Sequence, residues 1–188
     1  MNFIEMWHPE SFDLPTIERE LGWAAEIGMN AIRINLQYLG WLHDRDGTLD
    51  RLDRVMDVAA RFGISTVPCL FDDCGFGGQA PVWGTQPDPI PGVHNSRAVA
   101  SPGRRAVMDP SLRPSLQAYV RDIIGSFRSD NRVLFWDLYN EPGNLMEFHE
   151  NGFSTFAEDL EPASLTLMRD SFDWARAETP KQPLTVGA

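Results

Sequence analysis

Short apolar segments alternate with longer segments of helical periodicity along the whole chain, and this alternation constrains the fold more than any other feature. Such an order predicts a parallel sheet whose strands are joined by right-handed helical crossovers. The segment 64–71 is almost continuously apolar, as expected of a parallel strand covered on both faces. The expected strands are 3–7, 30–36, 64–71, 133–138 and 184–186, and the expected helices begin near Asp13, Thr48, Pro110 and Leu165.

Parallel sheets of this kind are either doubly wound and open or closed into a barrel. The first strand-to-helix turn, residues 7–11, has no glycine, and no GxxxxGK[ST] motif occurs, which disfavours the nucleotide-binding open sheets. We therefore expect an α/β fold that is a partial (β/α)8 barrel, with about four βα units and the start of a fifth strand. A whole barrel uses roughly 200 to 400 residues and this chain has 188, so residues 1–188 are expected to be its N-terminal portion, a half-barrel.

Charge and cysteine content exclude several classes of protein. The formal net charge of −11 repels nucleic acids and anionic membranes. No apolar run approaches the ~20 residues of a membrane span, and the start of the chain lacks a signal peptide, so the default expectation is a cytoplasmic protein. The two cysteines, Cys69 and Cys74, predict free thiols.

Residues 72–109 form a long segment that is dense in glycine and proline. Loops of this length inside compact domains are usually functional or disordered. Because Trp83, His94 and Asn95 lie among its turn residues, we expect an ordered binding loop.

Polar residues collect at the expected carboxyl ends of the strands, where parallel α/β folds assemble their active sites. Arg33 lies near the end of the second expected strand, and Asp72 and Asp73 follow the third. The fourth ends in the most informative segment, Trp136 to Pro142, which contains Asn140-Glu141-Pro142.

Asn-Glu-Pro at the end of a fourth strand resembles the acid/base motif of the clan A retaining glycoside hydrolases. The segments LGWAAEIGMNAIRINL and VLFWDLYNEPGN are most similar to the cellulase-like enzymes of glycoside hydrolase family five. The resemblance extends from Phe3 to Val186 and implies a TIM barrel that cleaves β-glycosidic bonds of poly- or oligosaccharides by a retaining two-carboxylate mechanism.

The resemblance implies roles for individual residues. Glu141 is expected to be the catalytic acid/base, partly desolvated at its strand end and with a raised pKa. Asn140 is expected to hold a sugar hydroxyl, and Arg33 to orient the nucleophile. A solvated turn Glu, a turn-forming Asn and an Arg paired with a structural acid are the alternative interpretations.

Further substrate contacts are expected from rim residues. Trp7, Trp41, Trp83 and Tyr139 could stack on sugar faces, and Asp72, Asp73 and His94 could contact hydroxyls, although core packing and turn capping explain the same residues. The spacing of Asp72, Asp73 and His94 matches no metal-ligand pattern, so no metal or cofactor is expected. The expected partner is a carbohydrate.

The resemblance also places the nucleophile at the end of a seventh strand, which this chain does not reach. A missing half would expose sheet edges and apolar side chains, so a second half-barrel, from another chain or another copy, is a further expected partner. The alternative function is a catalytically inactive carbohydrate-binding or structural half-barrel. A third hypothesis, a barrel enzyme that uses Glu141 as a base on a carbonyl substrate, would need an electrophile-stabilising Lys or metal that the strand ends lack.

Overall fold

The computed structural model describes residues 3–187 and contains a four-stranded parallel sheet with strand order β1-β2-β3-β6. The predicted α/β class and parallel sheet are confirmed. The four strands are β1 (Ala31–Asn35), β2 (Ser65–Asp72), β3 (Trp136–Asn140) and β6 (Leu184–Gly187).

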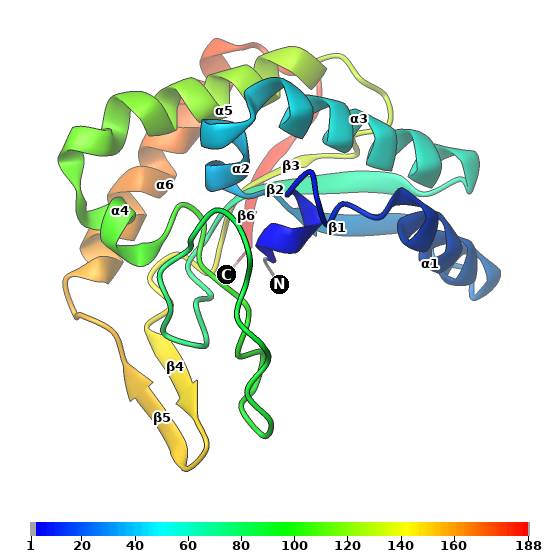
Figure 1. Cartoon of the computed structure of the whole chain (residues 1–188). Coiled ribbons are helices and arrows are strands. Elements are labelled where there is room, and N and C mark those ends of the chain that lie inside the picture. The colour runs from blue at the N-terminus through cyan, green and yellow to red at the C-terminus, as the bar shows by residue number, and fades with distance from the viewer. Residues whose placement is uncertain (1–2, 188) are drawn as a thin grey trace.

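Helices connect the strands, and Figure 1 shows α3, α5 and α6 along one face of the sheet. The loop that follows β2 and the hairpin of β4 and β5 project together from one end of the sheet (Figure 1). Within residues 3–187, no helix is long and apolar enough to cross a membrane. The remaining elements are η1 (Ile4–Met6), α1 (Leu14–Glu26), α2 (Tyr38–His43), α3 (Arg45–Arg61), α4 (Arg104–Met108), η2 (Pro110–Leu112), α5 (Arg113–Phe127), β4 (Met146–His149), β5 (Gly152–Thr155) and α6 (Leu160–Ala177).

The helix ends follow local sequence chemistry. The Asp13 carboxylate accepts a hydrogen bond from the Thr16 amide at 3.1 Å and caps α1, as predicted. Gly63 ends the chain segment after α3 with φ +72°, a conformation that costs a glycine little.

The main core lies between the sheet and the helices that cover it. Trp136 and Leu138 of β3 and Leu70 and Phe71 of β2 are fully buried, together with the apolar face of α5. That face consists of Leu116, Tyr119, Val120, Ile123, Ile124 and Phe127. Both cysteines are free thiols, as predicted, and both are buried.

The predicted first strand is wrong. Residues 4–6 form a turn of 3-10 helix, and the indole Nε1 of Trp7 donates to the Asn35 carbonyl oxygen at 2.8 Å. This bond places the segment across the carboxyl end of β1 instead of alongside a strand. The strand that carries Asn140 is therefore the third of the described sheet, where the sequence predicted a fourth.

Several elements were not predicted. These are the short helix α2, the helix α4 within the expected loop 72–109, and the antiparallel hairpin of β4 and β5. The Phe148 amide of this hairpin donates to the Phe76 carbonyl at 2.7 Å, so the hairpin docks on the loop that follows β2. That loop contains α4 near its end.

Candidate active site

Three strand ends meet at one edge of the sheet and bring the predicted residues together. Asp72 of β2 is in register with Asn140 of β3, which is in turn in register with Gly187 of β6. Asn35 ends β1 beside them, and its Nδ2 lies 3.3 Å from Asp72 Oδ2.

Arg33 is held by Asp137, a residue that the sequence analysis did not single out. Its Nε and Nη2 donate to Asp137 Oδ2 at 2.7 and 2.5 Å. The Asp137 side chain is only 4% exposed, so the carboxylate end of this ion pair is buried. An Asp in the buried strand β3 and an Arg on β1, two strands away in the sheet, were the available signal, because a buried charge requires a partner.

Asn140 is held from both sides. Its Oδ1 accepts from Arg33 Nη2 at 2.9 Å, and its Nδ2 donates to Asp72 Oδ1 at 2.9 Å. The same Nδ2 lies 3.2 Å from Cys74 Sγ. The orientation of this amide is therefore set by three side chains.

Asp72 supports Asn140 from behind and has no exposed surface. Burial raises the pKa of its carboxyl, against the opposing effect of hydrogen bonds from Asn140 and from the Cys74 amide. The structure thus gives Asp72 a positioning role, where a direct contact with substrate hydroxyls was expected.

Asp73 joins the end of β2 to the loop after β3 and to α6. Its carboxylate accepts from the Tyr139 hydroxyl at 2.9 Å, the Gly143 amide at 2.7 Å and the Ser164 hydroxyl at 2.6 Å. Burial raises the pKa of Asp73 to about 6. Tyr139 is itself fully buried, so it packs and donates here and presents no ring face to a sugar.

Glu141 lies on the turn that leaves β3 and has φ +46°, in the left-handed region that residues other than glycine rarely adopt. Its amide donates to the Gly187 carbonyl, and Asn144 Nδ2 donates to its Oε2, both at 2.6 Å. The side chain is exposed, which differs from the partial desolvation expected from the sequence.

An open cavity of about 640 Å³ adjoins Glu141 on the side of α6. Leu145, Leu165, Met168 and Val186 give it a largely apolar wall, and Glu161 is a second carboxylate on it.

The aromatic residues that were predicted to contact substrate lie in different parts of the structure. Trp7 is 1% exposed and serves packing, in place of the stacking role that was expected. Trp41 lies between helices, where its Nε1 donates to Asp122 at 2.7 Å. Trp83 is half-buried, stacks on His43 with an interplanar angle of 2° and packs against His8 with ring centroids 4.6 Å apart.

His94 lies in the long loop beside Phe76 and Phe148, with ring centroids 5.5 and 5.1 Å away. It therefore contributes to the packing of the loop on the hairpin. Within residues 3–187, no group of three or more His, Cys, Asp or Glu is arranged to hold a metal ion.

The comparisons with known proteins give a result for structure alone. No family model matches the chain, and no curated protein does. Among solved structures, a β-1,4-D-mannanase from Cryptopygus antarcticus is similar to the whole chain with a TM-score of 0.66 at 12% identity, over 54% of its own length. A β-mannanase from the blue mussel Mytilus edulis is similar to the whole chain with a TM-score of 0.63 at 14% identity, over 56% of its own length.

GH5_18 from Streptomyces cattleya, solved in complex with GlcNAc, matches 98% of this chain at 17% identity with a TM-score of 0.56, over 41% of its own length. The chain thus spans about half the length of the solved structures it matches. It has the fold of about half of a family-five-like TIM barrel, and the predicted resemblance is confirmed at the level of fold.

Proposed function

We propose that this chain carries the acid/base part of a retaining β-glycosidase site, with Glu141 as the acid/base. The observation that carries the proposal is the place of Glu141. It follows Asn140 at the carboxyl end of β3, and the Asn140 amide is held by Arg33 and Asp72 at 2.9 Å each. A site for a sugar ring needs its acid/base carboxyl and its hydrogen-bonding groups held in fixed relative positions, and Glu141 lies next to the restrained Asn140 amide.

The proposed chemistry begins with proton transfer from the Glu141 carboxyl to the glycosidic oxygen. The bond between that oxygen and the anomeric carbon breaks, and the alcohol leaves. A second carboxylate about 5 Å away takes the anomeric carbon as a glycosyl ester. Water then attacks that carbon while the Glu141 carboxylate accepts its proton, which releases the sugar and restores both carboxyls.

The second carboxylate would come from outside the described sheet. The resemblance places the nucleophile on a seventh strand, and residues 3–187 form four parallel strands. Asp72 and Asp73 are poor substitutes because both are buried and both are already engaged by donors. Arg33, held by Asp137, would stabilise negative charge at this edge through the guanidinium that also fixes Asn140.

The proposed substrate class is a β-linked oligosaccharide or polysaccharide. The solved mannanases and GH5_18 share the fold, and Trp83, partly open and stacked on His43, offers an aromatic face for a sugar ring. His94 and Trp41 pack their rings against other elements, as Trp83 does against His8 and His43, so all three are candidates of the same kind for substrate contact.

The test compares aryl β-glycosides whose leaving groups differ in acidity. We expect Glu141→Gln to lower kcat/KM by at least ~100-fold for a phenyl glycoside and far less for a dinitrophenyl glycoside, since only a poor leaving group needs the proton. Glu158→Gln, at an exposed acidic position, is the matched control. An equal loss for both substrates, or none, would contradict the acid role.

The exposure of Glu141 favours one second candidate, a carbohydrate-binding half-barrel without turnover. Calorimetric titration with manno- and cello-oligosaccharides separates the two. Binding that persists in Glu141→Gln, with no hydrolysis by the unchanged chain even when a second half-barrel is associated with it, would select the binding module.

A second half-barrel is the proposed protein partner. β1 and β6 are the edges of the described sheet, and unpaired edges promote association. Light scattering after size exclusion would show a dimer or larger assembly, whereas a monomer that unfolds cooperatively would oppose this proposal.

A further inference from the structure

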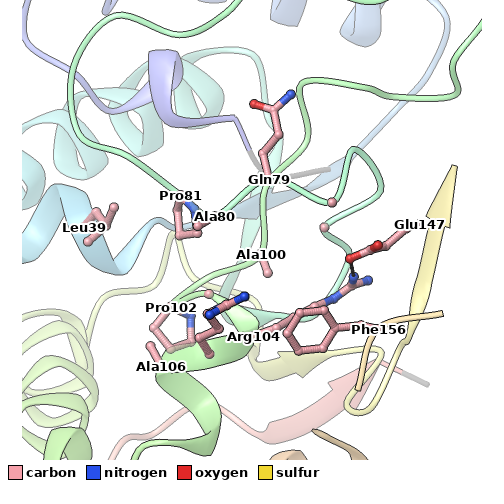
Figure 2. Close-up of a pocket in the computed structure, with 14 residues that line it drawn as sticks. Leu39, Gln79, Ala80, Pro81, Ala100, Pro102, Arg104, Ala106, Glu147 and Phe156 are labelled. Carbon is pink, nitrogen blue, oxygen red and sulfur yellow. Dashed lines mark hydrogen bonds and ion pairs between the residues drawn. The ribbon is translucent and has the colours of Figure 1, made fainter. Parts of the chain in front are cut away.

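A cavity separate from the Glu141 turn lies between the long loop, α4 and the hairpin of β4 and β5. Its volume is about 290 Å³, the lower end of the ~300–1,000 Å³ typical of small-molecule sites. Figure 2 shows Leu39, Ala80 and Pro81 on one side of it and Arg104, Glu147 and Phe156 on the other.

The walls of this cavity are built from small and apolar residues. Gly75, Ala80, Ala100 and Ala106 contribute little side-chain volume, so the space stays open. Leu39, Pro81, Pro102 and Phe156 add rigid apolar surface. The space admits one ring with an apolar face.

Arg104 forms a rigid part of the wall. Its Nε donates to the Asp73 carbonyl at 3.0 Å, its Nη2 to the Met146 carbonyl at 2.8 Å and its Nη1 to Glu147 Oε1 at 3.1 Å. The side chain is 5% exposed and its charge is matched by Glu147. Arg104 therefore fixes the wall of the cavity, and its own charge is neutralised by Glu147.

Arg105 supplies a positive charge that no carboxylate of the cavity wall neutralises. It is exposed, it lines the cavity, and among residues 3–187 it has no ion-pair partner, unlike Arg104. The charged lining residues are Arg104, Arg105 and Glu147, so the wall carries two guanidiniums against one carboxylate, a net charge of +1. This is unusual surface in a chain with a net charge of −11.

We infer that this cavity binds a carboxylate-bearing ring, with the ring against the apolar wall and the carboxylate on Arg105. A guanidinium pairs with a carboxylate through two parallel hydrogen bonds. A net charge of +1 matches a single negative charge, and Glu147 would repel a dianionic phosphate ester.

The cavity adjoins the candidate active site through its own wall. Gly75 follows Cys74, whose Sγ lies 3.2 Å from Asn140 Nδ2, and Arg104 binds the carbonyl of Asp73. If the proposed glycosidase function holds, the ring is a uronic acid residue of the substrate. An aromatic acid has the same recognition chemistry and does not rest on that function.

The experiment is a titration of the isotope-labelled chain with sodium glucuronate and with sodium benzoate, observed through amide resonances in two-dimensional NMR. Glucose and benzamide are the neutral counterparts. We expect saturable shifts at Gly75, Gly78 and Gly103 with at least one of the two acids and no saturation with its neutral counterpart. Glucuronate alone identifies a sugar subsite, and benzoate alone identifies an aromatic-acid site.

Variants test the assignment to Arg105. Arg105→Gln should weaken binding by ~10-fold or more, the size expected for a lost charged hydrogen bond. Arg128→Gln, at another exposed arginine without an ion pair in the described chain, should leave binding unchanged. Ala106→Leu should block the cavity and abolish binding by either acid.

Three results would overturn the inference: no saturation with either acid, equal binding of the neutral ring, or equal affinity in Arg105→Gln and Arg128→Gln. Glu141→Gln should retain the binding while it removes any hydrolysis. The inference and the proposed function can therefore fail independently.

Discussion

The ends of β2 and β3 lie side by side, and each presents carboxylates to the same edge of the sheet, yet their surroundings are opposite. Asp73 after β2 is fully buried and receives three hydrogen bonds from two other elements. Glu141 after β3 is exposed, and its carboxylate accepts from Asn144, three residues along the same turn, and interacts with the Cys74 thiol. Asp73, whose pKa is raised by burial, therefore stabilises the structure. Glu141, the carboxyl proposed for catalysis, is accessible.

This difference shows why a perturbed pKa at a strand end does not by itself identify a catalytic group. Perturbed carboxyls are enriched at active sites, but structural networks perturb them as well. Here the donors to Asp73 come from Tyr139, Gly143 and Ser164, and no substrate could reach the carboxylate without displacing them.

The largest effect is expected from removing the buried carboxylate. Asp73→Ala leaves the Tyr139, Gly143 and Ser164 donors without their acceptor, so at pH 5 we expect the free energy of unfolding to fall by about 3–5 kcal/mol. Glu141→Ala should change it by less than ~1 kcal/mol, because that side chain is exposed. Urea denaturation of both variants measures the contrast, and equal losses would erase the distinction between the two strand ends.

The next effect is a pH dependence that belongs to Asp73. Its pKa is about 6 in the folded chain against 3.8 unfolded, so the folded chain retains a proton that the unfolded chain releases between about pH 4 and 6. The stabilisation from Asp73 is complete below about pH 4 and declines as pH rises to about 6, by at most ~3 kcal/mol.

Comparison with Asp73→Asn isolates this contribution. The difference in the free energy of unfolding between the unchanged chain and the variant should shrink as pH rises from 4 to 7, because only the unchanged chain has the Asp73 carboxyl that loses its proton in this range. Carboxyls with lowered pKa, such as those of Asp44 and Asp130, are present in both chains, so their contributions cancel. A difference that is flat with pH would show that Asp73 is not the buried titrating group.

The smallest effect has the opposite sign and concerns Glu141. Because its φ is +46°, Glu141→Gly places glycine in a conformation that suits it, and we expect the free energy of unfolding to rise by up to ~1 kcal/mol. Thermal unfolding measures the change, with Glu158→Gly as an exposed control. A loss of stability would mean that the Asn144 hydrogen bond outweighs the backbone strain.

Much of the fold could be predicted because its elements depend on local patterns. The apolar periodicity of α3 and α5, the Asp13 cap and the apolar run of β2 all act within a few residues. The segment 3–7 could not be resolved this way, since its apolar pattern fits a strand or a turn equally. The decision lies in the Trp7 bond to Asn35, 28 residues away.

The candidate site, like the fold, was predictable only where it depends on local sequence and element order. Position at the strand ends follows from element order, so Arg33, Asp72, Asn140 and Glu141 could be expected at one edge. Which partner each side chain takes depends on contacts between distant segments, such as Ser164 of α6 with Asp73, which are 91 residues apart. The docking of the hairpin on the loop, and with it the cavity beside Arg105, depends on contacts of the same kind.

The contacts of the Arg33 side chain also indicate the curvature of the sheet. It starts on β1, lies 3.5 Å from Cys69 Sγ of β2, pairs with Asp137 of β3, and its Nη2 lies 2.8 Å from where a Cβ on Gly187 of β6 would be. Neighbouring strands are ~4.8 Å apart, so one side chain could not reach from the first strand to the fourth across a flat sheet. The four strands are therefore already bent to the curvature of a barrel, and glycine at position 187 leaves room at the centre of that curve.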